Sequence, residues 1–260
     1  MNHDSNLLWL SVSPSLKCLN RQLLSHLVKV APVRQWEYCQ SVDEPCCVDS
    51  IVAALHEYVS DRALIEARSG NPNYRVHLLG HGVSGAVALL YARQHPERVA
   101  SLTLLSVSAM PAVNWQAHYY AMRKLLPCSR EIVLTQMIQT LFDRQPVRFS
   151  KTLVHLLAKD LDSNLTFHSL AHSARIPKGG TKMPLLVCNG EQDSIVDNQG
   201  QVQWYEVMKE GDRMWHCPEG KHFFHFHHAQ ATAEVIAQHI ERARSQTKAP
   251  NLTPIVSKTA

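Results

Sequence analysis

Short apolar runs alternate with segments of helical periodicity along most of this 260-residue chain. The runs that predict strands are Leu7–Leu10, Gln35–Cys39, Tyr74–Leu79, Leu102–Val107, Met183–Cys188 and Arg213–Cys217. The segments that predict helices are Leu16–Leu27, Val48–Glu66, Gly85–His95, Gln199–Lys209 and Ala229–Ala243. Parallel neighbouring strands need a long crossover connection, which is usually a helix. The alternation therefore predicts an α/β fold with a mostly parallel sheet and helices on both of its faces.

One long segment, from about residue 110 to residue 182, interrupts this alternation because it contains no strand pattern. Its helical segments are Trp115–Leu125, Arg130–Leu141 and Phe149–Leu161. We therefore predict a core domain of residues 1–109 and 183–244, into which residues 110–182 are inserted as a helical cap. Residues 245–260 are poor in apolar side chains, which predicts a disordered tail.

The most specific motif lies where the strand that ends at Leu79 meets the following helix. Residues 76–85 read VHLLGHGVSG, and serine hydrolases carry G-x-S-x-G at such a strand-to-helix turn. The position of the nucleophilic serine is occupied here by Gly82. Glycine adopts the strained backbone of this turn at little cost, but it has no side chain with which to attack a substrate.

Two further residues follow this turn in an order typical of serine hydrolases. Asp193 comes shortly after the run Met183–Cys188, and His222 lies between the last predicted strand and the last helix. With this order and the segment GHGVSGAVALLYARQHPERVASLTLLS, the chain resembles the α/β-hydrolase superfamily over roughly residues 5–243. The resemblance implies that Asp193 is the acid and His222 the general base of a triad whose nucleophile position, Gly82, is vacant.

Two other places depart from the family pattern. Ser84 stands where the family has the second glycine of G-x-S-x-G, which it uses for close packing of helix and strand. Ser11 and Val12 stand where the family has a His-Gly pair that shapes the oxyanion hole. We expect a ligand pocket here, and its predicted binding residues are Ser11, Val12, His81, Val83, Ser84, Trp115 and Tyr119.

Two alternatives give the turn another role. In the first, Ser84 or Ser11 is a displaced nucleophile, although Ser84 lies two residues beyond the tip of the turn. In the second, residues 80–85 are the dinucleotide fingerprint G-x-G-x-x-G. That fingerprint requires an acidic residue after the next strand to hold a ribose, and the chain has Ser106 and Ser108 there.

A third alternative is a metal site, because histidines are dense near the C-terminal end of the predicted core. They are His216, His222, His225, His227 and His228. No cysteine or acidic residue has the spacing to them of a known zinc motif. We therefore expect neither a metal ion nor another cofactor.

Composition restricts the partners and the compartment. The net charge is +4 without a clustered basic patch, so we expect no nucleic-acid partner. Seven cysteines without regular spacing predict reduced thiols, and no apolar run is long enough for a membrane span, so we expect a cytoplasmic protein.

For the function, we predict a hydrolase-like protein that lacks serine-hydrolase activity and binds a small apolar ligand or a protein partner. The alternative is an enzyme in which the His222–Asp193 dyad acts as a general base on a small ester or carbonyl compound, as a hydrolase or a lyase.

Overall fold

The chain is built around a single parallel sheet. The computed structural model describes residues 6–40, 43, 47–110, 114–163 and 177–248. The strands are β1 (Leu7–Ser11), β2 (Val33–Glu37), β3 (Val76–His81), β4 (Val99–Leu105), β5 (Leu185–Gly190) and β6 (Arg213–Cys217). Their spatial order is β2-β1-β3-β4-β5-β6, and every neighbouring pair is parallel. This confirms the predicted α/β fold.

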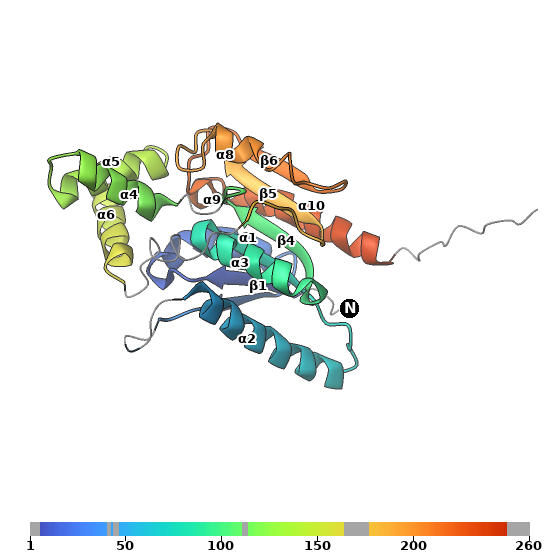
Figure 1. Cartoon of the computed structure of the whole chain (residues 1–260). Helices are drawn as coiled ribbons and strands as arrows, with labels where there is room; N and C mark the ends of the chain where they lie inside the picture. The colour runs from blue at the N-terminus through green and yellow to red at the C-terminus, as the bar shows by residue number, and fades with distance from the viewer. Residues whose placement is uncertain (1–5, 41–42, 44–46, 111–113, 164–176, 249–260) are drawn as a thin grey trace, which may run out of the picture.

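Helices cover both faces of the sheet (Figure 1). On one face, α2 (Val48–Arg68) and α3 (Gly82–Gln94) pack on one apolar cluster with the side chains of alternate strand positions. On the other face, α1 (Arg21–Leu27), α9 (Phe224–His227) and α10 (Ala229–Lys248) pack on the remaining strand positions. The inner strands β1, β4 and β5 are buried nearly along their whole length, as expected for a sheet covered on both sides.

Three helices lie beside the carboxyl ends of the strands. They are α4 (Trp115–Leu125), α5 (Arg130–Leu141) and α6 (Val147–Leu161) (Figure 1). With the 3₁₀ helix η1 (Pro14–Asn20) they form a third apolar cluster, which also includes Ile195 and Phe223. The first two match the helices predicted in this segment, and the third begins two residues earlier, directly after Pro146. Residues 111–113 and 164–176 of the predicted cap lie outside the described residues.

Several boundaries differ from the sequence-based prediction for local reasons. The fourth strand runs over Val99–Leu105 rather than Leu102–Val107, because Ser106 has φ +50° and turns the chain out of the sheet. The helix predicted over Gln199–Lys209 is only the short α8 (Asn198–Val202). Trp204 then turns inwards and donates from its indole Nε1 to the carbonyl oxygen of Val107 at 2.8 Å.

The predicted segment Leu16–Leu27 is divided into η1 and α1, and the helix predicted from Gly85 already begins at Gly82. Part of the predicted tail is helical, since α10 continues to Lys248, and residues 249–260 lie outside the described residues. A short 3₁₀ turn, η2 (Pro96–Arg98), connects α3 to β4.

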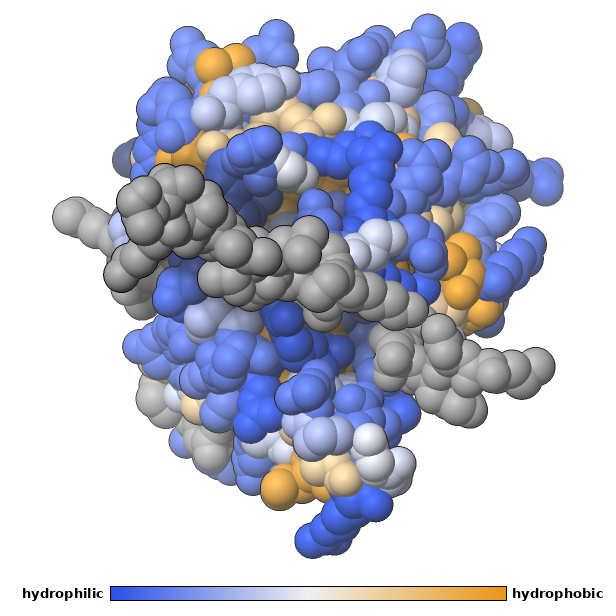
Figure 2. All heavy atoms as spheres, turned by 90° about the vertical axis from the view of Figure 1, so that its right-hand side faces the viewer, coloured by the Kyte–Doolittle hydropathy of each residue, from blue (hydrophilic) through white to orange (hydrophobic). Residues whose placement is uncertain are grey.

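The face turned away from α4–α6 is largely hydrophilic, with apolar side chains in small separate groups (Figure 2). In the part of the chain that the structure describes, no helix combines the length and the apolarity needed to cross a membrane. The six cysteines in that part are all free.

Candidate functional site

The turn between β3 and α3 depends on three glycines. A side chain at Gly80 would place its Cβ 2.7 Å from the backbone nitrogen of Gly85, and one at Gly85 would lie 2.5 Å from Cγ2 of Val107. Both positions therefore require glycine for the close approach of strand and helix. Gly82 has φ +51°, the left-handed backbone conformation that other residues rarely adopt. Close packing thus rests on Gly80 and Gly85, and Ser84 is tolerated in place of a glycine.

The vacant side-chain position at Gly82 faces His222. A Cβ built on Gly82 would have one heavy atom within 4 Å, the Nε2 of His222 at 3.9 Å. A serine hydroxyl at this position would extend one bond further and come within hydrogen-bond reach of the imidazole. The geometry at this point is that of a nucleophile and its base, with the nucleophile absent.

His222 is held by Asp193, as the family resemblance implied. The Nδ1 of His222 lies 3.0 Å from Oδ2 of Asp193, and the carboxylate also accepts from the backbone N–H groups of Ile195 and Val196 at 2.9 and 3.0 Å. Burial raises the pKa of Asp193, but the His222 ring and the two N–H groups outweigh it, so that the pKa lies below its ordinary value.

Asp193 is therefore an anion that fixes the Nδ1–H tautomer of His222. The Nε2 of this ring is buried, and it has no hydrogen-bond partner among the described residues. In the neutral ring, Nε2 carries the lone pair, which makes it a proton acceptor at the vacant position.

The backbone of His222 is fixed by two side chains from the carboxyl ends of neighbouring strands. Its carbonyl oxygen accepts from Nε2 of His81 at 3.0 Å and from the hydroxyl of Ser106 at 2.7 Å. Burial, with a smaller effect from His222, lowers the pKa of His81 to about 3, so the ring is neutral at pH 7. His81 and Ser106 thus position the base.

Ser84 is hydrogen-bonded to the loop after β1 and not to His222. Its hydroxyl oxygen accepts from the backbone N–H of Val12 at 3.0 Å, and both residues are buried. Since the Nε2 of His222 is unpaired, neither Ser84 nor Ser11 is hydrogen-bonded to the base. The structure therefore gives no support to a displaced nucleophile at either serine.

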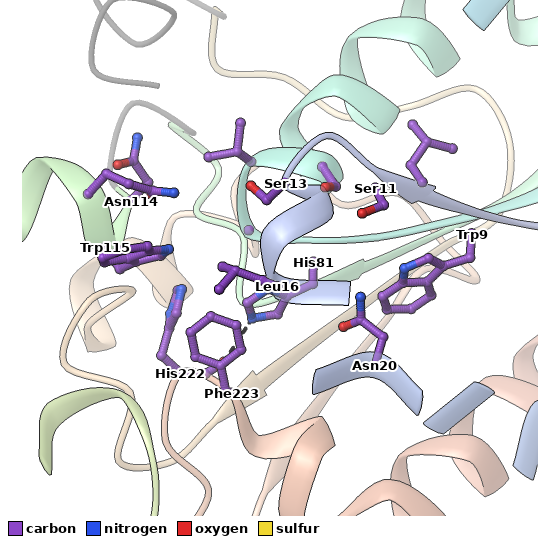
Figure 3. A pocket seen from close by; sticks show the side chains of 15 residues that line it. Trp9, Ser11, Ser13, Leu16, Asn20, His81, Asn114, Trp115, His222 and Phe223 are labelled. Carbon is purple, nitrogen blue, oxygen red and sulfur yellow. Dashed lines mark hydrogen bonds between the residues drawn. The ribbon is translucent and has the colours of Figure 1, made fainter. Parts of the chain in front are cut away.

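A small pocket opens at the tip of the turn, beneath α4 and η1 (Figure 3). It is lined by Trp9, Leu10, Ser11, Ser13, Leu16, Asn20, His81, Gly82, Val83, Ser84, Asn114, Trp115, Gln116, His222 and Phe223. In Figure 3, His222, Asn114 and Trp115 lie at one end and Trp9 and Asn20 at the other. The enclosed space is about 30 Å³, room for about one or two water-sized groups.

The structure separates the predicted binding residues into two groups. Those that line the pocket are Ser11, His81, Val83, Ser84 and Trp115. Val12 and Tyr119 do not line it: Val12 packs in the core, and Tyr119 packs among α5 and α6. Tyr119 lies one turn beyond Trp115 on the same helix face, which carries it past the pocket.

Sequence reasoning missed several polar groups at the pocket. Asn114 caps α4 by accepting from the N–H of Ala117 at 2.8 Å, and Asn before a helix is a recognisable signal for a cap. The places of Gln116 and Ser13 in the wall depend on how α4 and η1 pack against the sheet, and no local pattern indicates them.

The histidine cluster has other partners than a metal. In the ranges described, no group of three or more His, Cys, Asp or Glu side chains is arranged to hold a metal ion. His225 bonds to Oδ1 of Asn20 at 2.9 Å, His227 to Gln145 at 2.8 Å and His228 to Asp143 at 3.2 Å.

The dinucleotide interpretation also loses support. The two serines after β4 are used locally, since Ser106 bonds to His222 and the hydroxyl of Ser108 accepts from the N–H of Met110 at 3.2 Å.

Comparison with known proteins identifies the family. Residues 49–228 match the family model described as serine aminopeptidase, S33, and the chain belongs to this family of α/β-hydrolases. It is 41% identical over 238 residues to an uncharacterised protein of Synechocystis sp., with 92% of this chain and 91% of that protein covered. An uncharacterised protein of Nostoc sp. is 38% identical over 236 residues, covering 91% and 90% of the two chains.

A solved structure shows the same fold. The esterase EaEST from Exiguobacterium antarcticum superposes with a TM-score of 0.67, covering 93% of each chain at 15% sequence identity. At this level of identity the likeness concerns the fold alone. The chain is thus an α/β-hydrolase-like protein, and its chemistry has to be argued from its own site.

Proposed function

We propose that this chain is a member of the α/β-hydrolase fold without serine-hydrolase activity, which binds a small ligand in the pocket beneath α4 and η1. One observation carries the proposal: the side-chain position at Gly82 faces Nε2 of His222 at 3.9 Å and is empty. A serine hydrolase without its nucleophile retains only the effects of binding and of oxyanion donors. In this proposal, residues 110–182 act as a cap whose first helix forms part of the pocket wall.

The lining of the pocket bears on the kind of ligand. Polar side chains such as Ser13, Asn114 and Gln116 stand beside the apolar Trp115 and Phe223. The sequence predicted a small apolar ligand or a protein partner, and this mixture of side chains favours a small ligand that also has hydrogen-bonding groups.

Labelling with a fluorophosphonate probe, followed by intact-mass measurement and peptide mapping, tests the loss of serine chemistry. We expect no adduct on the wild-type protein. The variant Gly82→Ser should acquire an adduct at residue 82 that disappears when His222→Gln is added. Gly82→Ala is the matched control, because it has the same backbone strain and no hydroxyl. A stoichiometric adduct on Ser84, Ser11 or another pocket serine of the wild type would refute the proposal.

A second candidate function rests on the intact dyad. The imidazole of His222 is oriented by Asp193 and presents an unpaired Nε2 to the pocket, which is the arrangement of a general base. If the protein turns over a small ester or carbonyl compound by this route, His222→Gln should lower the rate by about 10²–10⁴-fold. Asp193→Asn should also lower it, and the matched surface variant Asp162→Asn should not. A rate that is insensitive to both dyad substitutions would exclude this candidate.

A further inference from the structure

A buried carboxylate stands behind the pocket wall, and no cationic side chain among the described residues forms an ion pair with it. Asp160 is on α6, on the face whose other buried residues are the apolar Leu153 and Leu157, and it is 1% exposed. The Nε2 of Gln116 on α4 donates to its Oδ2 at 3.0 Å, and Ser13 in the loop after β1 is close enough to lower the pKa of the carboxyl. Asp160 forms no ion pair with any described residue, and its Oδ1 has no hydrogen-bond partner among them.

A carboxylate at this place has no structural advantage. An apolar residue would continue the buried stripe of α6, whereas an unpaired buried carboxylate destabilises a fold strongly. A group of this kind is stable when a donor or a cation completes its surroundings. The described residues supply one neutral donor, the amide of Gln116, with the hydroxyl of Ser13 nearby, and no counter-ion for the negative charge.

The contact with Asp160 leaves Gln116 with an acceptor. Gln116 and Ser13 both line the pocket together with His222, and Gln116 uses its amide donor on Asp160. What remains at Gln116 is Oε1, a buried acceptor that has no partner among the described residues. Asp160 therefore orients the amide of Gln116 and places a negative charge behind the pocket wall, where the hydroxyl of Ser13 offers a second acceptor.

We infer that Gln116, positioned by Asp160, and the neighbouring Ser13 form a subsite for a small primary ammonium group; this inference rests on the proposed ligand-binding function. A primary ammonium group carries three donors and one positive charge, so it can bond to several acceptors and neutralise Asp160 at once. An alcohol offers one donor and no charge, and a quaternary ammonium ion offers no donor. The small volume of the pocket, about 30 Å³, also favours a compact head group over a bulky one.

Binding of three matched probes at pH 8 tests the subsite. n-Butylammonium is the expected ligand, n-butanol is its neutral analogue, and tetramethylammonium is a cation without donors. Calorimetry gives the affinities, and the ring resonances of His222, assigned with His222→Gln, report whether a probe enters this pocket. We expect n-butylammonium to bind about tenfold more tightly than either of the other probes, as for a hydrogen bond to a charged group.

Two variants assign the preference to the named residues. Asp160→Asn keeps the size of the side chain and removes its charge, and it should bring n-butylammonium and n-butanol to within about twofold of each other. Gln116→Leu removes the acceptor and should have the same effect. Asp162→Asn, at the exposed end of α6, is the matched control and should keep the preference. The melting temperature of each variant shows that it is folded.

The outcomes separate this inference from the proposed function. Equal affinities in the wild type, or a preference that survives in Asp160→Asn, overturn the ammonium subsite while leaving the pocket as a ligand site. If no probe shifts the ring of His222, the subsite and the ligand-binding function both fail. The absence of serine chemistry is decided separately, by the fluorophosphonate labelling.

Discussion

Replacing Asp160 by asparagine removes a buried charge with almost no change in the shape of the side chain. Burial raises the pKa of Asp160 from 3.8 to about 6, although the hydrogen bond from Gln116 and the proximity of Ser13 act to lower it. Between these two values the folded protein binds more protons than the unfolded chain. Its stability therefore falls as the pH rises through this window, and the loss is complete above the folded pKa.

The size of the effect follows from the two pKa values. One pKa unit corresponds to about 1.4 kcal/mol, so the step from 3.8 to about 6 lowers the free energy of unfolding of the wild type by about 3 kcal/mol. Asp160→Asn has no proton to lose. The difference in stability between variant and wild type should therefore increase in favour of the variant by about 3 kcal/mol between pH 3.5 and pH 8.

Urea unfolding followed by tryptophan fluorescence at several pH values measures this difference. The other titrating groups are shared by both proteins and cancel in the comparison. Asp162→Asn loses only an exposed ion pair with Arg130, worth about 0–1 kcal/mol, and should show no comparable trend with pH. A difference curve for Asp160→Asn that stays flat from pH 3.5 to pH 8 would show that Asp160 is not a buried, unneutralised carboxylate, and the reasoning about the subsite would fall with it.

Three further predictions concern the turn and the dyad. Ser84→Ala leaves the buried N–H of Val12 without its acceptor and should lower the free energy of unfolding by about 1–3 kcal/mol in urea. In Gly82→Ala, the alanine has to adopt φ +51°, and the free energy of unfolding should fall by about 1–2 kcal/mol. An increase in the free energy of unfolding would show that this backbone conformation is not strained. The pKa of Asp193 is lowered in the folded protein, so the stability that its carboxylate contributes is present above pH 3.8 and is lost as the pH falls through the folded pKa. Asp193→Asn should therefore reduce the loss of unfolding free energy at acidic pH, as measured by urea unfolding at several pH values.

The parts of the site that follow from the sequence are those with a fixed spacing or order. The glycines of the turn lie within six residues, so a local pattern indicates both the strand-to-helix turn and the missing nucleophile. Asp193 and His222 are far from that turn, but each follows a strand of a parallel sheet. The carboxyl ends of parallel strands meet at one edge, which brings these residues together.

The parts that could not be predicted depend on packing between distant segments. The contact between Gln116 and Asp160 joins two helices across 44 residues, and it depends on the rotation of each helix about its own axis. A helical pattern predicts which face of α6 is buried. Asp160 on that face is an exception to the apolar pattern, and the pattern does not show which residue it contacts. Val12 and Ser84, 72 residues apart, likewise meet only because a loop folds onto the turn.

The buried atoms around the pocket that have no hydrogen-bond partner within the described ranges include Nε2 of His222, Oε1 of Gln116 and Oδ1 of Asp160. Buried polar atoms without partners destabilise a fold, and most buried polar groups of native proteins are paired. A protein that had retained this fold for its shape alone would gain stability from apolar side chains at these positions. These three atoms belong to two helices and a loop that are far apart in sequence, and they lie at or behind the wall of one pocket. Residues that lower the stability of a fold are expected where the structure is adapted to bind a ligand. In the proposed function, the site has lost the reaction that needs a serine nucleophile, and these unpaired groups are the ones that a bound ligand would satisfy.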